Sequence, residues 1–194
     1  MSKAFLDNVK LLLGSSLLNS GMARSEAVIH VASEKIIEVL TSLRDAPQTE
    51  MNQLVDLCGV DYPDREKRFE VVYQLLSLKH NKRLSVCVAI AKDEAVPSVT
   101  SVYPSAGWFE RETYDLLGIE FTGHPDLRRI LTDYDFEGHP LRRDFPLSGK
   151  VQVRYDDLQG CVVKEPVRLE EPYREFHTQS KWRGLTDVQK RGRA

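Results

Sequence analysis

Cysteine is scarce in this chain of 194 residues, and its three cysteines, Cys58, Cys87 and Cys161, lie far apart. None of them belongs to a C-x-x-C pair, so the sequence encodes neither a disulfide framework nor a cysteine-ligated cluster. A reducing compartment suits such a chain. Because Cys58 and Cys87 stand in apolar runs typical of strands, we expect both to be small buried hydrophobic residues.

Long apolar runs and an excess of one charge are also missing. No stretch approaches the roughly 18 apolar residues that suggest a membrane-spanning helix, so any membrane association would be indirect. The 27 basic and 29 acidic residues nearly balance, which argues against a protein whose main task is to neutralise phosphates or an anionic membrane surface. The N-terminal residues also lack the pattern of a secretory signal or an Arg-rich transit peptide.

Apolar residues recur at helical spacing near the N-terminus. Phe5, Leu6, Val9 and Leu12 are among those that would share one side of a helix. The spacing predicts a helix over residues 4–18 that Gly21 brings to an end.

Residues 24–44 allow two interpretations. In the first, residues 27–32 form a strand and Ser33 caps a helix that ends before Pro47. In the second, one long helix runs through the whole region. Sequence alone leaves both open.

From residue 54 the apolar pattern changes to a period of two, which is typical of strands. Residues 54–60, 69–75 and 84–90 are predicted strands, and residues 99–103 are a possible fourth. The polar residues 79–82 are short enough to close an antiparallel hairpin. A sheet with one apolar face must bury that face. The sequence therefore predicts an α+β fold, with a small, largely antiparallel sheet covered on one side by helices.

The periodicity ends after Phe121, which divides the chain into a predicted core domain, residues 1–120, and an extended segment, residues 121–194. Many prolines and charges interrupt the second part, and only residues 151–155 and 161–163 resemble strands. Apolar anchors nevertheless recur in it: Leu127, Ile130, Leu131, Tyr134, Phe136, Leu141, Phe145, Tyr155, Tyr173, Phe176 and Trp182. A disordered linker would have few of these. We expect the segment to lie extended across another protein, with each anchor in a pocket there.

One helix is predicted between Ser105, a suitable N-cap, and Gly118, a suitable stop. The apolar side would carry Phe109, Thr113, Leu116 and Leu117, and the other side Trp108, Arg111, Glu112 and Asp115. A charged stripe of this kind is usually a solvated face. The alternative is a set of hydrogen bonds to a partner, because an arginine can grip a carboxylate with two parallel bonds.

This helix opens a signature that continues well beyond it. The sequence Glu110-Arg111-Glu112, two residues, Asp115-Leu116-Leu117, six residues, His124, three residues, Arg128 resembles that of the C-subunit family of NADH:quinone oxidoreductase, respiratory complex I. The likeness extends over roughly residues 50–180 and includes the blocks 56–62 and 68–73. A match of this length is more specific than any single short motif.

The resemblance implies a structural subunit of the peripheral, hydrophilic arm of this proton-translocating enzyme. Such a subunit supports electron transfer from NADH to quinone by scaffolding the quinone-site subunit and neighbouring iron–sulfur subunits, without being catalytic. FMN, iron–sulfur clusters and quinone would all bind to other subunits. The chain would lie on the matrix face of the mitochondrial inner membrane or on the cytoplasmic face of the bacterial membrane. The implied partner interface consists of Trp108, Glu110, Arg111, Glu112, Asp115, His124, Arg128, Arg129, His139, Arg142, Arg143, Asp144 and Phe145.

Two other functions are compatible with parts of the sequence. A metal-dependent hydrolase could use His124, Asp126, Asp133, Asp135 and His139 as ligands. No two of them stand at a recognised metal spacing, however, and both histidines precede prolines, which favours extended turns.

A nucleic-acid-binding protein could use the basic clusters at 128–129, 142–143 and 190–193 as phosphate contacts. Acidic residues interrupt every cluster except the last, which favours salt bridges within the fold or to a partner protein. The sequence also has no P-loop and no dinucleotide-binding fingerprint.

Overall fold

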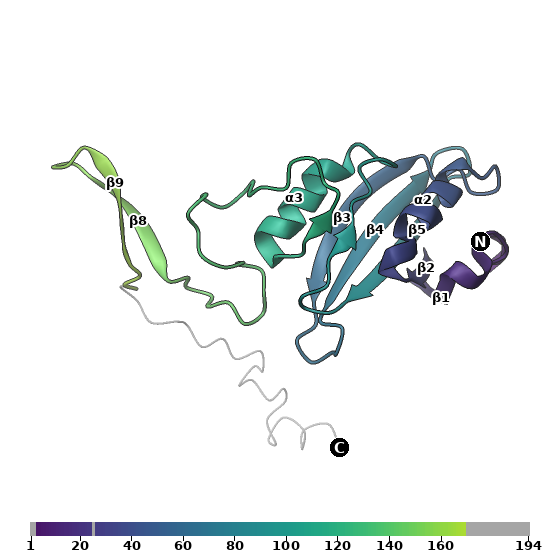
Figure 1. Ribbon diagram of the computed structural model, residues 1–194, viewed down its shortest axis with the longest axis horizontal. Coiled ribbons are helices and arrows are strands. Elements are labelled where there is room, and N and C mark those ends of the chain that lie inside the picture. The colour runs from purple at the N-terminus through teal and green to yellow at the C-terminus, as the bar shows by residue number, and fades with distance from the viewer. Residues whose placement is uncertain (1–2, 25, 170–194) are drawn as a thin grey trace, which may run out of the picture. The chain divides into compact units, whose positions relative to one another are not determined.

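The computed structural model describes residues 3–24 and 26–169. The chain divides into two compact units, Met1–Leu147 and Ser148–Ala194. The first unit carries the sheet and the helices shown in Figure 1. It therefore includes residues 121–147, which the sequence pattern places in the extended segment.

Five strands form the main sheet: β1 (Leu17–Ala23), β2 (Glu26–Val31), β3 (Gln53–Asp61), β4 (Phe69–Ser77) and β5 (Lys82–Ile90). Their order is β1-β2-β5-β4-β3, and only the β2–β5 pair of this sheet is parallel. The predicted α+β class and the largely antiparallel sheet are confirmed. The predicted hairpin is also confirmed, with residues 78–81 joining β4 to β5.

The first predicted helix is too long at its C-terminal end. Helix α1 covers Lys3–Leu13, and Gly14 follows with a φ of +48°, a left-handed conformation that glycine adopts without steric cost. A 3-10 turn at Gly14–Ser16 leads into β1. Gly21 lies inside this strand rather than at a helix end, so its predicted role was wrong.

In residues 24–44 the strand and the helix are confirmed and the single long helix is wrong. After β2, a 3-10 turn at Ser33–Lys35 leads into α2 (Ile36–Asp45). Ser33 does not cap the helix, because its hydroxyl donates to Glu94 instead, at 2.7 Å. Helix α2 ends before Pro47, as expected.

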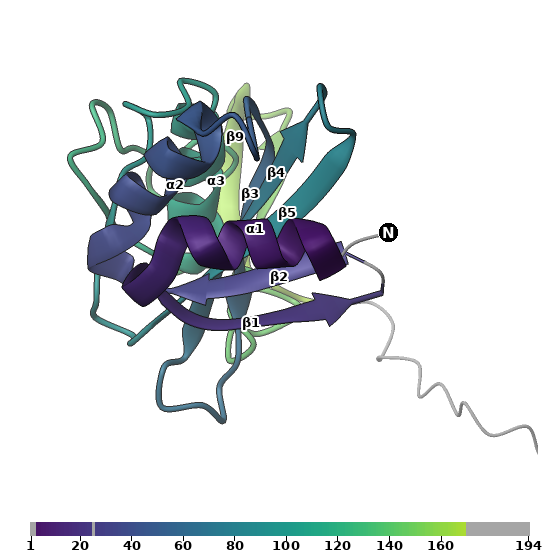
Figure 2. The same cartoon turned by 90° about the vertical axis from the view of Figure 1, so that its right-hand side faces the viewer.

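The core lies on one face of the sheet. Along β4, Phe69, Val71, Tyr73 and Leu75 are fully or almost fully buried, whereas the alternate residues are half-buried. The buried face packs in one cluster with apolar residues of α1, α2 and α3 (Ala106–Leu117), and Figure 2 shows α1 and α2 against the sheet. Helix α3 approaches β3 at Gly59, where a Cβ atom would meet Leu117 and Thr113.

Residues 99–103 do not form the possible fourth strand. The backbone N–H groups of Val102 and Tyr103 both donate to the carbonyl of Val99, so the chain turns. The Tyr103 hydroxyl then reaches the Met51 carbonyl at 2.6 Å, a long-range contact without a local signal. The strand nearby is β6 (Val96–Pro97), which pairs in parallel with β7 (Phe121–Thr122).

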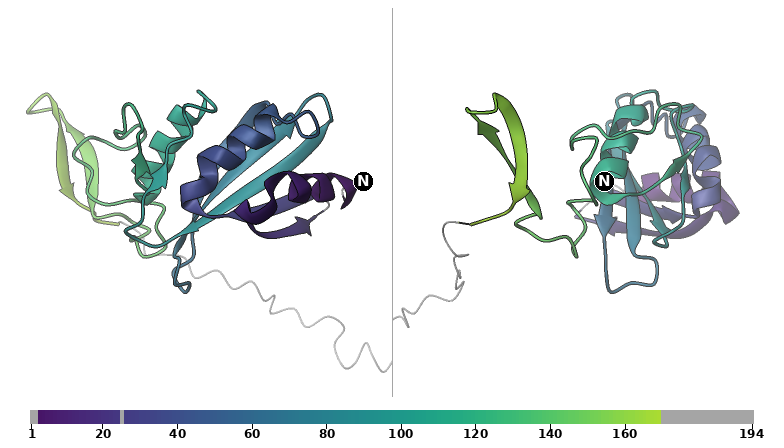
Figure 3. Two further views of the ribbon diagram at one scale, coloured as in Figure 1. Left: turned by 45° about the vertical axis from the view of Figure 1, so that its right-hand side comes forward. Right: turned by 60° about the vertical axis from the view of Figure 1, so that its left-hand side comes forward.

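The second unit contains an antiparallel hairpin, β8 (Val151–Asp156) and β9 (Cys161–Pro166), whose two strands can be followed in Figure 3. Both short strands predicted in this region are confirmed, and each is longer than predicted. The predicted anchors Tyr173, Phe176 and Trp182 lie outside the described residues.

The two cysteines with predicted positions differ. Cys87 on β5 is buried, as expected, but Cys58 on β3 is exposed. The alternation along β3 places Leu57 in the core and Cys58 on the opposite face of the sheet.

Candidate functional site

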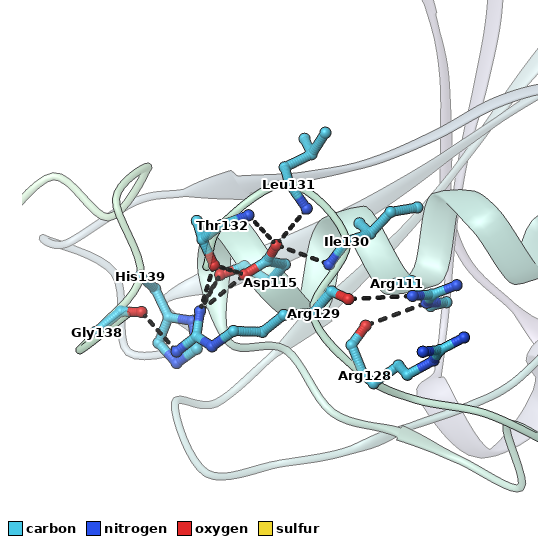
Figure 4. A network of polar contacts seen from close by, with 9 residues as sticks. All are labelled: Arg111, Asp115, Arg128, Arg129, Ile130, Leu131, Thr132, Gly138 and His139. Carbon is cyan, nitrogen blue, oxygen red and sulfur yellow. Dashed lines mark hydrogen bonds and ion pairs between the residues drawn. The ribbon is translucent and has the colours of Figure 1, made fainter. Parts of the chain in front are cut away.

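The strongest polar site surrounds the carboxylate of Asp115 in the third turn of α3 (Figure 4). One carboxylate oxygen accepts the backbone N–H groups of three consecutive residues, Ile130, Leu131 and Thr132, at 3.0, 2.7 and 2.8 Å. The other accepts the Thr132 hydroxyl and, at 2.7 Å, the Arg129 guanidinium. Asp115 thus holds the chain that follows the core, residues 124–145, which we call the strap.

The Asp115 side chain is fully buried. Burial by itself would raise the pKa of this carboxyl group, but the hydrogen bonds from Thr132, Ile130 and Leu131 outweigh burial and hold the pKa well below its usual value. Asp115 is therefore ionised in the folded chain. Because this many donors from the strap converge on one buried carboxylate, the strap is held in a single conformation.

Arg111, one turn before Asp115, also binds the strap. Its guanidinium donates to the carbonyls of Arg128 and Arg129 at 3.1 and 3.0 Å, and it lies over the Trp108 ring at 5.3 Å. Arg111 and Asp115 are buried under the chain's own strap, whereas Trp108 and Glu112 are exposed. The charged face that the sequence pattern predicted for this helix is therefore partly covered by another part of the same chain.

Glu110 faces the other way, into the core. Its carboxylate accepts the Ser98 hydroxyl at 2.6 Å and the backbone N–H of Val99 at 2.7 Å, and burial raises its pKa. His124, at the start of the strap, lies 3.9 Å from this carboxylate and contacts the Gly107 carbonyl at 3.0 Å. Glu110 and His124 thus attach residues 98–99 and the start of the strap to α3.

The C-terminal end of α3 is bound by the second half of the strap. His139 contacts the Asp115 carbonyl through Nδ1 at 2.9 Å, and Arg142 donates to the Leu117 carbonyl at 2.6 Å. Both side chains lie against Gly118, whose φ is +72°. A Cβ atom at this position would collide with His139 and Arg142. These side chains satisfy carbonyls that a helix end leaves without partners. Burial lowers the pKa of His139.

The strap ends at a second carboxylate, Asp61 at the end of β3. Asp61 pairs with Arg68 at 2.7 and 2.8 Å and accepts the backbone N–H of Arg143 at 2.8 Å. Arg68 also pairs with Asp144 at 3.0 Å. The hydrogen bonds from Arg68 hold the pKa of Asp61 below its usual value.

Two aromatic rings pack against each other inside the strap. Phe136 and Phe145 stack with 5.9 Å between ring centroids, and Gly138, with a φ of +95°, leaves room beside Phe145. Arg129 lies over the Phe136 ring at 5.8 Å. The strap thus has a small packed centre as well as polar ties.

Every predicted interface residue except Glu112 has an intramolecular contact described above. Sequence reasoning missed Asp61, Arg68, Ser98 and Thr132 as partners in these contacts. Asp61 and Arg68 stand in the two upstream blocks that resemble the family. Asp61 is opposite Phe69 in the β3–β4 pair, which brings it next to Arg68. Thr132 stands in the block 124–134, which continues the family signature, whereas Ser98 carried no signal.

Large apolar side chains of α3 and of the strap remain exposed. Trp108, Leu131 and Tyr134 are 66%, 62% and 79% exposed. Arg128, also exposed, donates to Asp126 at 2.9 Å and approaches the Tyr134 hydroxyl at 3.5 Å. We call these three apolar residues with Arg128 the strap surface.

The rival functions find little support in this geometry. Among the residues that the structure describes, no group of three or more His, Cys, Asp or Glu side chains is arranged to hold a metal ion. Arg129 and Arg142, two of the candidate phosphate contacts, are bound to the chain itself, and the cluster at 190–193 lies outside the described residues. Within the same range, no helix is long and apolar enough to cross a membrane.

The fold occurs in a solved respiratory complex. A chain of the membrane-bound sulfane sulfur reductase, an archaeal respiratory membrane complex, is similar with a TM-score of 0.60 at 25% sequence identity. The match covers 73% of this chain and 85% of that chain. The fold is thus of a class that also occurs in an archaeal respiratory membrane complex.

The particular family follows from sequence comparison. The model of the respiratory-chain NADH dehydrogenase 30 Kd subunit family matches residues 29–151. The C subunit of NADH-quinone oxidoreductase from Methylobacterium sp. (strain 4-46) is 53% identical over 186 residues, 96% of this chain and 86% of the relative. The same subunit of Agrobacterium fabrum is 50% identical over 191 residues, 97% and 96% of the two chains. The chain belongs to the 30 Kd subunit family of respiratory-chain NADH dehydrogenase, which confirms the resemblance to the C-subunit family of complex I.

Proposed function

We propose that this chain is a scaffolding subunit of the peripheral arm of NADH-quinone oxidoreductase and carries out no redox step itself. Its core and strap hold the quinone-site subunit and neighbouring iron–sulfur subunits in place, so that electrons pass from NADH to quinone over workable distances. FMN, iron–sulfur clusters and quinone bind to those other subunits. The chain meets the membrane only through the assembled complex, on its cytoplasmic or matrix face.

The observation that carries this proposal is the strap surface. Leu131 and Tyr134 are large apolar side chains that stand in water on the strap, which the ties to Asp115 and Arg111 fix, and Trp108 is exposed on α3. Aromatic residues and arginine are enriched where protein interfaces contribute most binding energy. A surface that is held in shape before binding also loses less conformational entropy on association.

The intramolecular role of the signature supports the same proposal from another side. The buried carboxylates and guanidiniums are already hydrogen-bonded to the chain, so they act by positioning the strap surface. The direct contacts to a neighbour would then come from the exposed members, Trp108, Glu112 and Arg128.

A matched pair of substitutions tests this function. Leu131→Asp changes the strap surface, and Leu11→Asp makes the same change at an 84% exposed leucine of α1. We expect Leu131→Asp to lower the yield of assembled enzyme about tenfold or more, since a buried leucine contributes roughly 1.5–3 kcal/mol. The yield is measured on native gels and by co-purification under mild detergent.

The Leu11→Asp chain should assemble like wild type, and both isolated variants should unfold at the wild-type urea concentration. Equal assembly of the two variants would count against the strap surface as an interface. Failure of the wild-type chain to co-purify with flavin- and iron-containing subunits would count against the function as a whole.

A further inference from the structure

Glu110 is a carboxyl group enclosed in the core. The residue is 0% exposed. In the part of the chain that the structure describes, its only neighbour with a basic side chain at ion-pair distance is His124, 3.9 Å from the carboxylate. A buried carboxylate without a counter-charge is costly, and such a group takes up a proton more readily than one in water.

His124 is held in a neutral form by its own hydrogen bonds. Its Nδ1 accepts the backbone N–H of Asp126 at 3.0 Å, so the ring hydrogen lies on Nε2, which donates to the Gly107 carbonyl at 3.0 Å. A second ring hydrogen would occupy Nδ1 and displace the Asp126 N–H. The carboxylate of Glu110 therefore receives no positive charge from the strap.

Tyr73 of β4 is the other titratable group that the carboxylate affects. Burial and then the charge of Glu110 raise the pKa of this phenol, so its hydroxyl stays neutral. The hydroxyl is buried without a hydrogen-bond partner among the described residues and donates nothing to Glu110. The side chains of the strap and of β4 thus leave a charge on Glu110 uncompensated.

Two hydroxyl groups connect this carboxyl group to the outside of the core. Ser98 Oγ lies 2.6 Å from Glu110 Oε2 and 2.9 Å from Thr100 Oγ1, and either hydroxyl of the Ser98–Thr100 pair can be the donor. Ser98 is buried, whereas Thr100 is half-buried. The row of three side chains therefore runs from the core to one that water can reach.

The row has two complete hydrogen-bonded states. With Glu110 ionised, Thr100 donates to Ser98, which donates to the carboxylate. With Glu110 protonated, the acid donates to Ser98, which donates to Thr100. Ser98 Oγ donates once and accepts twice in both states, because the backbone N–H of Thr100 also donates to it at 3.3 Å. Oε1 accepts the Val99 N–H throughout. Protonation therefore removes a buried charge without breaking a hydrogen bond.

We propose that Glu110 is a proton-binding site in the core and that the Ser98–Thr100 hydroxyl pair reverses its direction when the proton binds. The proton comes from solvent and forms an O–H bond on Oε2. Ser98 then turns its hydrogen to Thr100, and Thr100 turns its own to solvent. The attachment of residues 98–99 to α3 is thereby freed of a buried charge. The site lies within one chain and does not depend on the proposed scaffolding function.

Glu110→Gln tests the site, because the amide places an N–H where the protonated acid has its O–H. Burial raises the pKa of Glu110 above its usual value of 4.5. The stability contributed by the bound proton is therefore complete below pH 4.5 and is lost as the pH rises through the folded pKa. We expect the urea midpoint of the wild-type full-length chain to fall relative to that of Glu110→Gln over this rise in pH.

Glu112→Gln is the matched control, since Glu112 is exposed on the same helix. Its urea midpoint should follow that of wild type at every pH. If the wild-type chain and Glu110→Gln keep a constant difference in midpoint across the pH range, Glu110 does not bind the proton and the site is overturned.

Carbon-13 NMR of the carboxyl carbons follows the proton directly. We expect the Glu110 carbon to titrate at a higher pH than the Glu112 carbon in the full-length chain. Thr100→Val removes the oxygen that accepts from Ser98 in the protonated state, so the Glu110 titration should move to lower pH. Thr100→Ser keeps a hydroxyl and should retain the wild-type titration.

Each measurement has an outcome that rejects the proposal. Coincident titration of Glu110 and Glu112 would overturn the proton-binding site. An unchanged Glu110 titration in Thr100→Val would overturn the reversal of the hydroxyl pair. Uptake of the proton by the His124 ring in place of Glu110, seen in the imidazole resonances, would overturn the assignment to the carboxyl group.

Discussion

Asp115 is a single buried carboxylate that fixes the path of a whole segment of the chain. Three backbone N–H groups, a hydroxyl and a guanidinium converge on its two oxygens. A donor that is left buried without a partner costs about 1–3 kcal/mol. The side chain therefore decides the path of the strap, including the backbone of the exposed Leu131.

Replacement of Asp115 by asparagine is expected to destabilise the chain by about 2–4 kcal/mol at pH 7, since Arg129 loses its buried counter-charge. The folded pKa of Asp115 lies below its usual value of 3.8. Its contribution is therefore fully present above that pH and is lost as the pH falls further. The difference between wild type and variant, measured by urea unfolding, should shrink from pH 7 to pH 3.

Asp126→Asn is the matched control for this experiment. Asp126 also pairs with an arginine of the strap, but both side chains of that pair are 57% exposed, and exposed pairs contribute little. We expect unfolding like that of wild type. Hydrogen exchange at the amides of residues 130–132 should accelerate in Asp115→Asn alone, and slow exchange there would refute the role given to the carboxylate.

At the scale of elements, α3 is placed by what surrounds it more than by its own sequence. It packs on β3 at Gly59, and its C-terminal end closes on Gly118 under His139 and Arg142. Position 59 is a strand residue with no need for an unusual backbone angle, so glycine is required there by the close approach of Leu117. The alternation of apolar residues along a strand does not show how closely a helix approaches it, so the sequence pattern could not predict this requirement for glycine.

Alanine at Gly59 is therefore expected to push α3 away from the sheet and to destabilise the first unit by about 1–3 kcal/mol. Gly21→Ala in β1 is the control, because a Cβ atom there would meet nothing within 4 Å. That variant should be as stable as wild type or slightly more stable. Thermal unfolding followed by circular dichroism distinguishes them, and equal melting temperatures would argue against the tight contact.

Local patterns predicted the elements better than their ends. The strands around residues 54–60, 69–75 and 84–90 were found because alternation directly reports burial on one face. The end of α1 was missed because Leu17 and Leu18 continue the apolar pattern past Gly14. Ser33 was assigned to a helix cap, since the acceptor that takes its hydroxyl, Glu94, is remote in sequence.

For the whole molecule, the position of the boundary between the units has a direct consequence. Sequence patterns predicted a change after residue 120, but Asp115, Asp61 and Arg68 tie the strap to the core as far as Asp144. The compact unit ends at Leu147. The strap thus folds with the core.

Limited proteolysis of the isolated chain should consequently cut first beyond Leu147 and leave a resistant fragment that includes the strap, because cleavage needs local unfolding. In the assembled enzyme we expect the same sites to be protected by the neighbouring subunit. Mass spectrometry of the fragments locates the cuts. Early cleavage between residues 124 and 145, as rapid as that beyond Leu147, would contradict the attachment of the strap.

The sequence by itself determined the α+β class, most of the sheet and, through an extended signature, the family to which the chain belongs. Periodicity and motifs suffice for these because both are written in residues near one another along the chain. Only the tertiary structure decided what the signature residues do. Asp115 meets its donors 14 to 17 residues away, and Asp61 meets Arg143 across 82. Hydrogen bonds over such separations depend on how the chain folds back on itself, and nothing in the local pattern distinguishes a charge bound internally from one that faces water.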